Sequence, residues 1–135
     1  MNKVIIYDNM IEGERMDWQI EYYKKKNGNI PVLEFLLKLN PKIRVKAYNE
    51  IRLLREYGIY LKEPYVKSIK GEKYKGIYEL RINQGNDTSR IFYFTYNKNI
   101  FIMLNGFIKK TNKTPKAELE KAKKYKIDYE ERCKS

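Results

Sequence analysis

Two nearly continuous apolar runs, Ile91–Phe94 and Ile100–Leu104, lie on either side of a short polar turn, Asn97-Lys98-Asn99. Strands buried on both faces of a sheet carry apolar residues in succession, whereas half-buried strands alternate apolar and polar residues. The two runs therefore predict two central strands of one sheet.

Shorter segments predict the rest of the sheet. Residues 17–24 and 76–83 alternate apolar and polar side chains, as half-buried strands do, and residues 66–69 are also strand-like. Polar and glycine-rich turns separate these segments.

Helical spacing of apolar residues appears in three places. It begins at Pro31, begins again at Pro41 and continues to Gly58, which predicts a helical hairpin ended by a glycine cap. Thr114 and Pro115 open a last helix, expected over residues 116 to about 125, with Glu118 in a capping box.

The predicted order is strand, helix, helix, three or four strands, helix. It indicates an α+β domain with the helices, including the hairpin, packed on one face of a mostly antiparallel sheet. A chain of 135 residues is expected to form one domain. We assign it to residues 17–135, and we treat residues 1–16 as an N-terminal extension in which residues 4–7 could add a short strand.

The composition excludes several kinds of chemistry. The chain has no His and one Cys, so it has no Ser-His-Asp triad, no intramolecular disulfide, and no thiolate or imidazole zinc site. Cys133, among charged residues near the end, is expected to be a solvated thiol. No apolar run of about 18 residues exists, so we expect no membrane span and a cytoplasmic protein.

The net charge is +12, and the positive charge is unevenly distributed. Residues 105–135 carry ten basic against five acidic side chains, whereas residues 1–16 are slightly acidic. A basic domain attracts polyanions, nucleic acid first and acidic proteins second. A solvated lysine-rich surface is the plain alternative.

Three stretches carry a more specific signal: Gly76–Arg81, Ser89–Tyr93 and Leu104–Pro115, with Glu118 and Ala122 beyond them. In this arrangement they resemble the phage-derived, HigB-type toxins of the RelE/ParE superfamily. The resemblance covers roughly residues 17–125.

The resemblance implies a RelE-like microbial RNase fold, β-α-α-β-β-β-α, with a helical hairpin packed on one face of the sheet. It implies the toxin of a type II toxin–antitoxin system, which cleaves messenger RNA on the ribosome. Cleavage would use the substrate 2′-hydroxyl, with no metal and no cofactor. The neutralising partner would be a helix-turn-helix, HigA-like antitoxin.

The candidate site residues are cations and one acid. Candidates for catalysis are Arg81, Arg90, Lys110, Lys109 and Glu79, and candidates for RNA binding are Lys113, Lys75 and Lys73. An arginine fork donates to two phosphate oxygens at once, and a lysine can neutralise the phosphate or protonate the leaving oxygen. We favour Lys110 over Lys109, whose side chain could point to the other face. Arg90 equally fits a structural ion pair with Glu79 or Asp87.

Asn105 departs from the family pattern, because relatives often have His before the Gly-Phe pair. An amide cannot take a proton, so the general base is left between Glu79, a tyrosine and a lysine. Tyr78, Tyr93 and Phe107 are expected to be packing residues.

Two alternatives share the fold. A ParE-like protein would inhibit another target, such as DNA gyrase, without nuclease activity. A degenerate relative would only bind nucleic acid.

Overall fold

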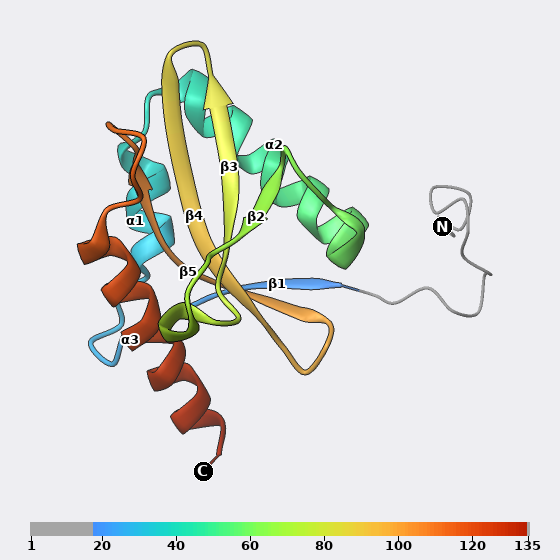
Figure 1. Cartoon of the computed structure of the whole chain (residues 1–135), viewed down its shortest axis with the longest axis vertical. Helices are drawn as coiled ribbons and strands as arrows, with labels where there is room; N and C mark the ends of the chain where they lie inside the picture. The colour runs from blue at the N-terminus through green and yellow to red at the C-terminus, as the bar shows by residue number, and fades with distance from the viewer. Residues whose placement is uncertain (1–17, 135) are drawn as a thin grey trace, which may run out of the picture.

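The computed structural model describes residues 18–134, and the predicted extension 1–16 lies outside the described residues. The elements are β1 (Gln19–Tyr22), α1 (Pro31–Lys38), α2 (Pro41–Tyr57), η3 (Gly58–Tyr60), β2 (Val66–Ser68), η4 (Glu72–Tyr74), β3 (Tyr78–Gln84), β4 (Asp87–Tyr96), β5 (Ile100–Ile108) and α3 (Lys116–Cys133). Here η denotes a single 3-10 turn. Figure 1 shows their arrangement.

The described strands form one five-stranded sheet in the order β1-β5-β4-β3-β2. β2, β3, β4 and β5 pair antiparallel with their neighbours, and β1 pairs parallel with β5. The two apolar runs lie on β4 and β5, inside the sheet, as predicted. The register of this central pair shifts between Phe92 and Tyr93, which lie opposite Asn105 and Met103, so Leu104 is the extra residue of a bulge.

The α1–α2 hairpin packs on one face of the sheet (Figure 1). Its buried side chains, such as Val32, Leu36 and Leu54, join Leu80 and Ile91 from the strands in one apolar cluster. The hairpin sequence explains its own boundaries. Pro41 starts α2 after an Asn40 cap, and α2 ends at Gly58, whose φ of 58° is a conformation that favours glycine. The predicted α+β class, the mostly antiparallel sheet and the hairpin on one face are confirmed, as in a RelE-like fold.

Helix α3 covers the opposite face, so the sheet lies between two helical layers rather than having all its helices on one face. A second cluster on this face joins Ala122 of α3 to Phe92 and Phe94 of β4. α3 also continues to Cys133, past the predicted end near Tyr125. The reason is Tyr129, which packs edge-on against Phe94 with ring centroids 5.8 Å apart and gives the added turns a partner.

The predicted capping box at α3 does not form. The N-cap residue is Pro115, which makes no side-chain capping bond, and the Glu118 carboxylate instead accepts a hydrogen bond from Asn105. Among the described residues, no helix combines the length and apolar character needed to cross a membrane.

Candidate active site

Three of the predicted catalytic residues share the face of the sheet that α3 covers in part. Leu80 and Ile82 of β3 point into the cluster beneath the hairpin, so the alternating residues Glu79 and Arg81 point to the other face. Arg81 lies directly opposite Arg90 on β4. Adjacent strands therefore bring two guanidinium groups and one carboxylate together.

Glu79 is the buried centre of this group. Its Oε2 lies 3.3 Å from Nε of Arg81 and 3.7 Å from Nε of Arg90. The side chain of Glu79 is 3% exposed, that of Arg90 6%, and that of Arg81 23%. Two neighbouring cations repel each other in a region of low dielectric, and a shared carboxylate offsets that repulsion. We call Glu79, Arg81 and Arg90 the arginine clamp.

Arg90 is held on several sides. Its Nη1 donates to Oδ1 of Asn83 at 3.1 Å and to the backbone oxygen of Ser89 at 2.9 Å. Burial lowers the pKa of Arg90, Glu79 raises it, and Arg81 lowers it further. The group stays cationic at any physiological pH. Arg90 forms its ion pair with Glu79 rather than with Asp87. Arg90 is therefore the buried, structural arginine of the clamp, and Arg81 is the arginine that solvent can reach.

Lys109 follows β5 directly. Its N–H donates to the backbone oxygen of Thr88 at 2.7 Å, which extends the ladder between β5 and β4 by one residue. Phe107 is buried in the cluster beneath α3, so alternation directs Lys109, two residues later, to the clamp face. Lys110 and Lys113 lie in the exposed segment that leads to α3. The backbone thus favours Lys109 over Lys110 as the clamp's neighbour, against the preference drawn from the sequence.

Lys73 and Lys75, proposed as RNA ligands, are paired with acids. Nζ of Lys73 lies 2.9 Å from Oε2 of Glu120 on α3, and Tyr74 also donates to that carboxylate. Nζ of Lys75 lies 4.0 Å from Oε2 of Glu72. The Tyr74 hydrogen bond, and then Lys73, lower the pKa of Glu120. Lys73 therefore fastens η4 to α3, whereas Lys75 pairs only with its near neighbour Glu72, and the structure groups neither lysine with the clamp.

Asn105, which precedes the Gly106-Phe107 pair, is 3% exposed. Its Nδ2 donates to the backbone oxygen and to Oε1 of Glu118, both at 3.1 Å. The next residue, Gly106, lies so close to α1 that an added Cβ would be 2.4 Å from Cδ2 of Phe35. Asn105 therefore joins β5 to the first turn of α3 and performs no proton transfer.

Lys67 is a cation that sequence reasoning missed. It lies on β2 opposite Glu79, so it shares the clamp face, and it makes no ion pair with the described residues. In the sequence, Lys67 stands between Val66 and Ser68, so its side chain is expected on the opposite face of the strand from theirs. Only the pairing of β2 with β3, however, places that face beside the clamp. Lys67, Arg81, Arg90 and Lys109 thus form a row of cations across four strands.

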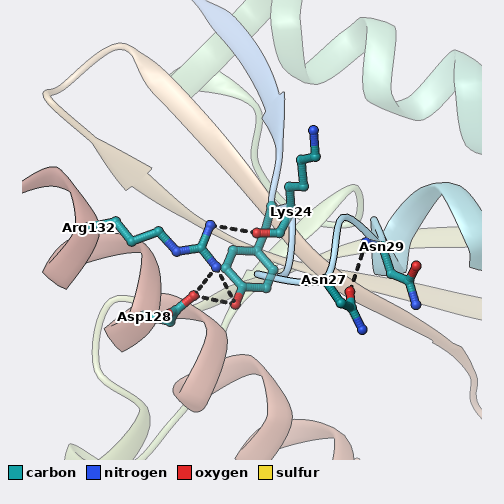
Figure 2. A network of polar contacts seen from close by, with 6 residues as sticks. Lys24, Asn27, Asn29, Asp128 and Arg132 are labelled. Atoms are coloured by element: carbon teal, nitrogen blue, oxygen red, sulfur yellow. Dashed lines mark hydrogen bonds and ion pairs between the residues drawn. The ribbon is translucent and has the colours of Figure 1, made fainter.

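The far end of α3 is fixed to the chain after β1 (Figure 2). The hydroxyl of Tyr23 donates to Oδ2 of Asp128 at 2.6 Å, and Arg132 donates to Asp128 and, at 2.7 Å, to the backbone oxygen of Lys24. The Tyr23 hydrogen bond is the main reason that the pKa of Asp128 is lowered, although burial opposes it. With Asn105 at one end and this network at the other, α3 is held along its length.

Within residues 18–134, no cluster of three or more Cys, Asp or Glu side chains could hold a metal ion. The clamp and the lysines on its face offer positive charge and hydrogen-bond donors. The partly exposed guanidinium of Arg81, held by the buried carboxylate of Glu79 and on the same face as Lys67 and Lys109, is suited to binding a phosphate group and to stabilising added negative charge on it.

A comparison with protein families matches residues 34–126 to the family described as Phage derived protein Gp49-like (DUF891). The match covers more than half of the chain and includes the whole clamp, Lys67 and Lys109. No curated protein matches the chain.

Proposed function

The chain belongs to the Gp49-like family of phage-derived proteins, and from this membership and the arginine clamp we propose that it is a HigB-type toxin that cleaves messenger RNA. The substrate is messenger RNA on the ribosome, so the protein acts in the cytoplasm. The partner that neutralises it is a HigA-like, helix-turn-helix antitoxin.

The observation that carries this proposal is the buried carboxylate of Glu79 between two arginines. A surface arginine samples many rotamers, whereas Arg81 is held by Oε2 of Glu79 at 3.3 Å. Groups that are fixed before the reaction stabilise a transition state without paying for reorganisation. The side chain of Arg81 is 23% exposed, against 3% for Glu79 and 6% for Arg90, so Arg81 is the residue of the clamp that RNA can contact.

In the reaction, the 2′-oxygen of one nucleotide attacks the adjacent phosphorus, the bond to the 5′-oxygen breaks, and the proton of the 2′-hydroxyl passes to solvent water. The products are a 2′,3′-cyclic phosphate and a 5′-hydroxyl. Arg81 neutralises the pentavalent phosphorane through its planar fork. Lys109 supplies charge, and a proton for the departing 5′-oxygen. Glu79 is too buried to take the 2′-hydroxyl proton, so it acts as a positioning residue.

Charge also supports the proposed partner. A protein of net charge +12 is efficiently captured by a surface of opposite sign. An antitoxin that lays acidic side chains over Lys67, Arg81 and Lys109 would block the clamp. Co-purification of the chain with the helix-turn-helix protein encoded beside it tests this pairing.

The test of the proposed activity is induction in growing cells followed by mapping of messenger 5′ ends. Wild-type protein is expected to stop growth and to create new ends, and Arg81→Ala is expected to do neither. Arg52→Ala is the matched control, because Arg52 lies on α2 with its side chain 53% exposed and paired only with neighbours on its own helix. The control should remain toxic.

Growth arrest without new 5′ ends would contradict the nuclease assignment and favour a ParE-like inhibitor of another target. Full toxicity of Arg81→Ala would show that the clamp is not the site. No growth effect from the wild type would favour a protein that only binds nucleic acid.

A further inference from the structure

A cavity of about 380 Å³ lies on the face of the sheet opposite the clamp. It exists because α2 ends at Gly58 before it has covered the whole face, and the chain then turns away towards β2. The strands form the floor and the segment after α2 forms a wall. The floor includes Tyr78, Tyr93, Thr95 and Phe101. Lys62 lies on the wall, and Ser68 of β2 lies at the edge.

The floor is aromatic and rigid. Tyr78 and Tyr93 are cross-strand partners whose rings stack, with centroids 5.7 Å apart and planes 21° apart. Phe101 supports Tyr93 from the side in an edge-on contact, with centroids also 5.7 Å apart. Tyr93 is 4% exposed, whereas Tyr78 is 38% exposed. Burial raises the pKa of Tyr93, so its phenol stays neutral. A planar ligand thus meets an aromatic platform already held in place.

The edge of the cavity is polar. Lys62 is exposed and makes no ion pair with the described residues, and Ser68 and Thr95, two residues with hydroxyl side chains, are among the lining residues. The residues that line the cavity include one acid, Glu63, and two lysines, Lys62 and Lys67. Alternation places the Lys67 side chain towards the clamp face, so Lys62 is the cation best placed for a ligand anion at this edge.

These features together select a ligand class. Base stacking on aromatic side chains is a common way to hold a nucleotide, and it tolerates different bases. A volume of about 380 Å³ falls in the range of sites for small molecules. We propose that this cavity binds one nucleotide, with its base stacked on Tyr78 and its phosphate at Lys62. The nucleotide is either free or part of an RNA strand, and the site is separate from the clamp.

The test uses calorimetric titration of the full chain, because residue 18 packs against Gly58 at the cavity and joins the described part to the segment before it. The probes are adenosine 5′-monophosphate, adenosine and a short oligoadenylate RNA. We expect Tyr78→Ala to weaken binding of the monophosphate about tenfold and Tyr78→Phe, which keeps the ring, to preserve it. Lys62→Ala should weaken the monophosphate and leave adenosine unchanged.

Two controls separate this site from others. Tyr48→Ala removes an exposed tyrosine on α2 outside this cavity and should bind normally. Arg81→Ala should bind the monophosphate normally even if it loses cleavage, so failure of the proposed nuclease activity does not decide this test.

Equal affinity for the monophosphate and the RNA would identify a free nucleotide as the ligand. Tighter RNA binding that persists in Arg81→Ala and falls in Tyr78→Ala would identify a strand. Absence of binding by the wild type, or binding that is unchanged in both Tyr78→Ala and Lys62→Ala, would overturn the proposal.

Discussion

Replacing Glu79 with Gln tests whether the clamp depends on a buried charge. The change keeps the size of the side chain and removes the negative charge that faces Arg81 and Arg90. Removing one partner of a buried ion pair costs about 3 to 5 kcal/mol. Arg81 is 23% exposed, and Arg90 keeps its hydrogen bonds to Asn83 and Ser89, so we take the low end, about 3 kcal/mol. In a domain of this size that corresponds to a fall in Tm of roughly 10 °C.

The assay is urea unfolding followed by the fluorescence of Trp18, which is buried in the cluster beneath the hairpin. Glu50→Gln is the matched control. Glu50 is equally buried, but its ion-pair partner is Lys46, whose side chain is 36% exposed, so we expect a cost of about 1 kcal/mol. If Glu79→Gln costs no more than Glu50→Gln, the carboxylate does not hold the arginines together and our reasoning about the clamp fails.

Three further results are expected. Asp128 has a pKa below its ordinary 3.8, so its stabilisation is present at neutral pH and is lost as pH falls through the folded value. Between pH 7 and pH 2 the free energy of unfolding should therefore fall more steeply for the wild type than for Asp128→Asn. Equal slopes would show that Asp128 does not fasten α3 to Tyr23. Gly58→Ala should lose at least about 2 kcal/mol in urea unfolding, because the φ of 58° disfavours alanine and its Cβ would lie 2.1 Å from Cδ2 of Trp18; a neutral result would contradict the described packing. Lys67→Ala should weaken RNA binding and lower its salt dependence by about one counterion, measured against Lys124→Ala on the exposed side of α3. Equal binding by the two lysine variants would remove Lys67 from the site.

The local features of the fold could be predicted because they depend on neighbours in sequence. The apolar runs identified the central strands, because a strand buried on both faces needs apolar residues in succession. Gly58 identified the end of α2, because a helix end with a positive φ favours glycine. The alternation of Glu79 and Arg81 with apolar residues also placed both on one face.

Features that depend on distant partners could not be predicted. The length of α3 depends on Tyr129 meeting Phe94, and the failure of the capping box depends on Asn105 meeting Glu118. Lys67 joins the clamp face only through the pairing of β2 with β3, and a shift of one residue in that pairing would reverse its side. Register and tertiary contacts, not local pattern, therefore decided the composition of the site.

The central claim is that Arg81 stabilises a phosphorane during cleavage of RNA. Its most direct test is the chemistry of the RNA ends made after induction, with wild type and Arg81→Ala expressed at equal levels. Our account expects 5′-hydroxyl and 2′,3′-cyclic phosphate ends with the wild type, and their loss by at least about a hundredfold with Arg81→Ala. New ends that carry a 5′-phosphate, or the same yield of cyclic phosphate from both proteins, would contradict it.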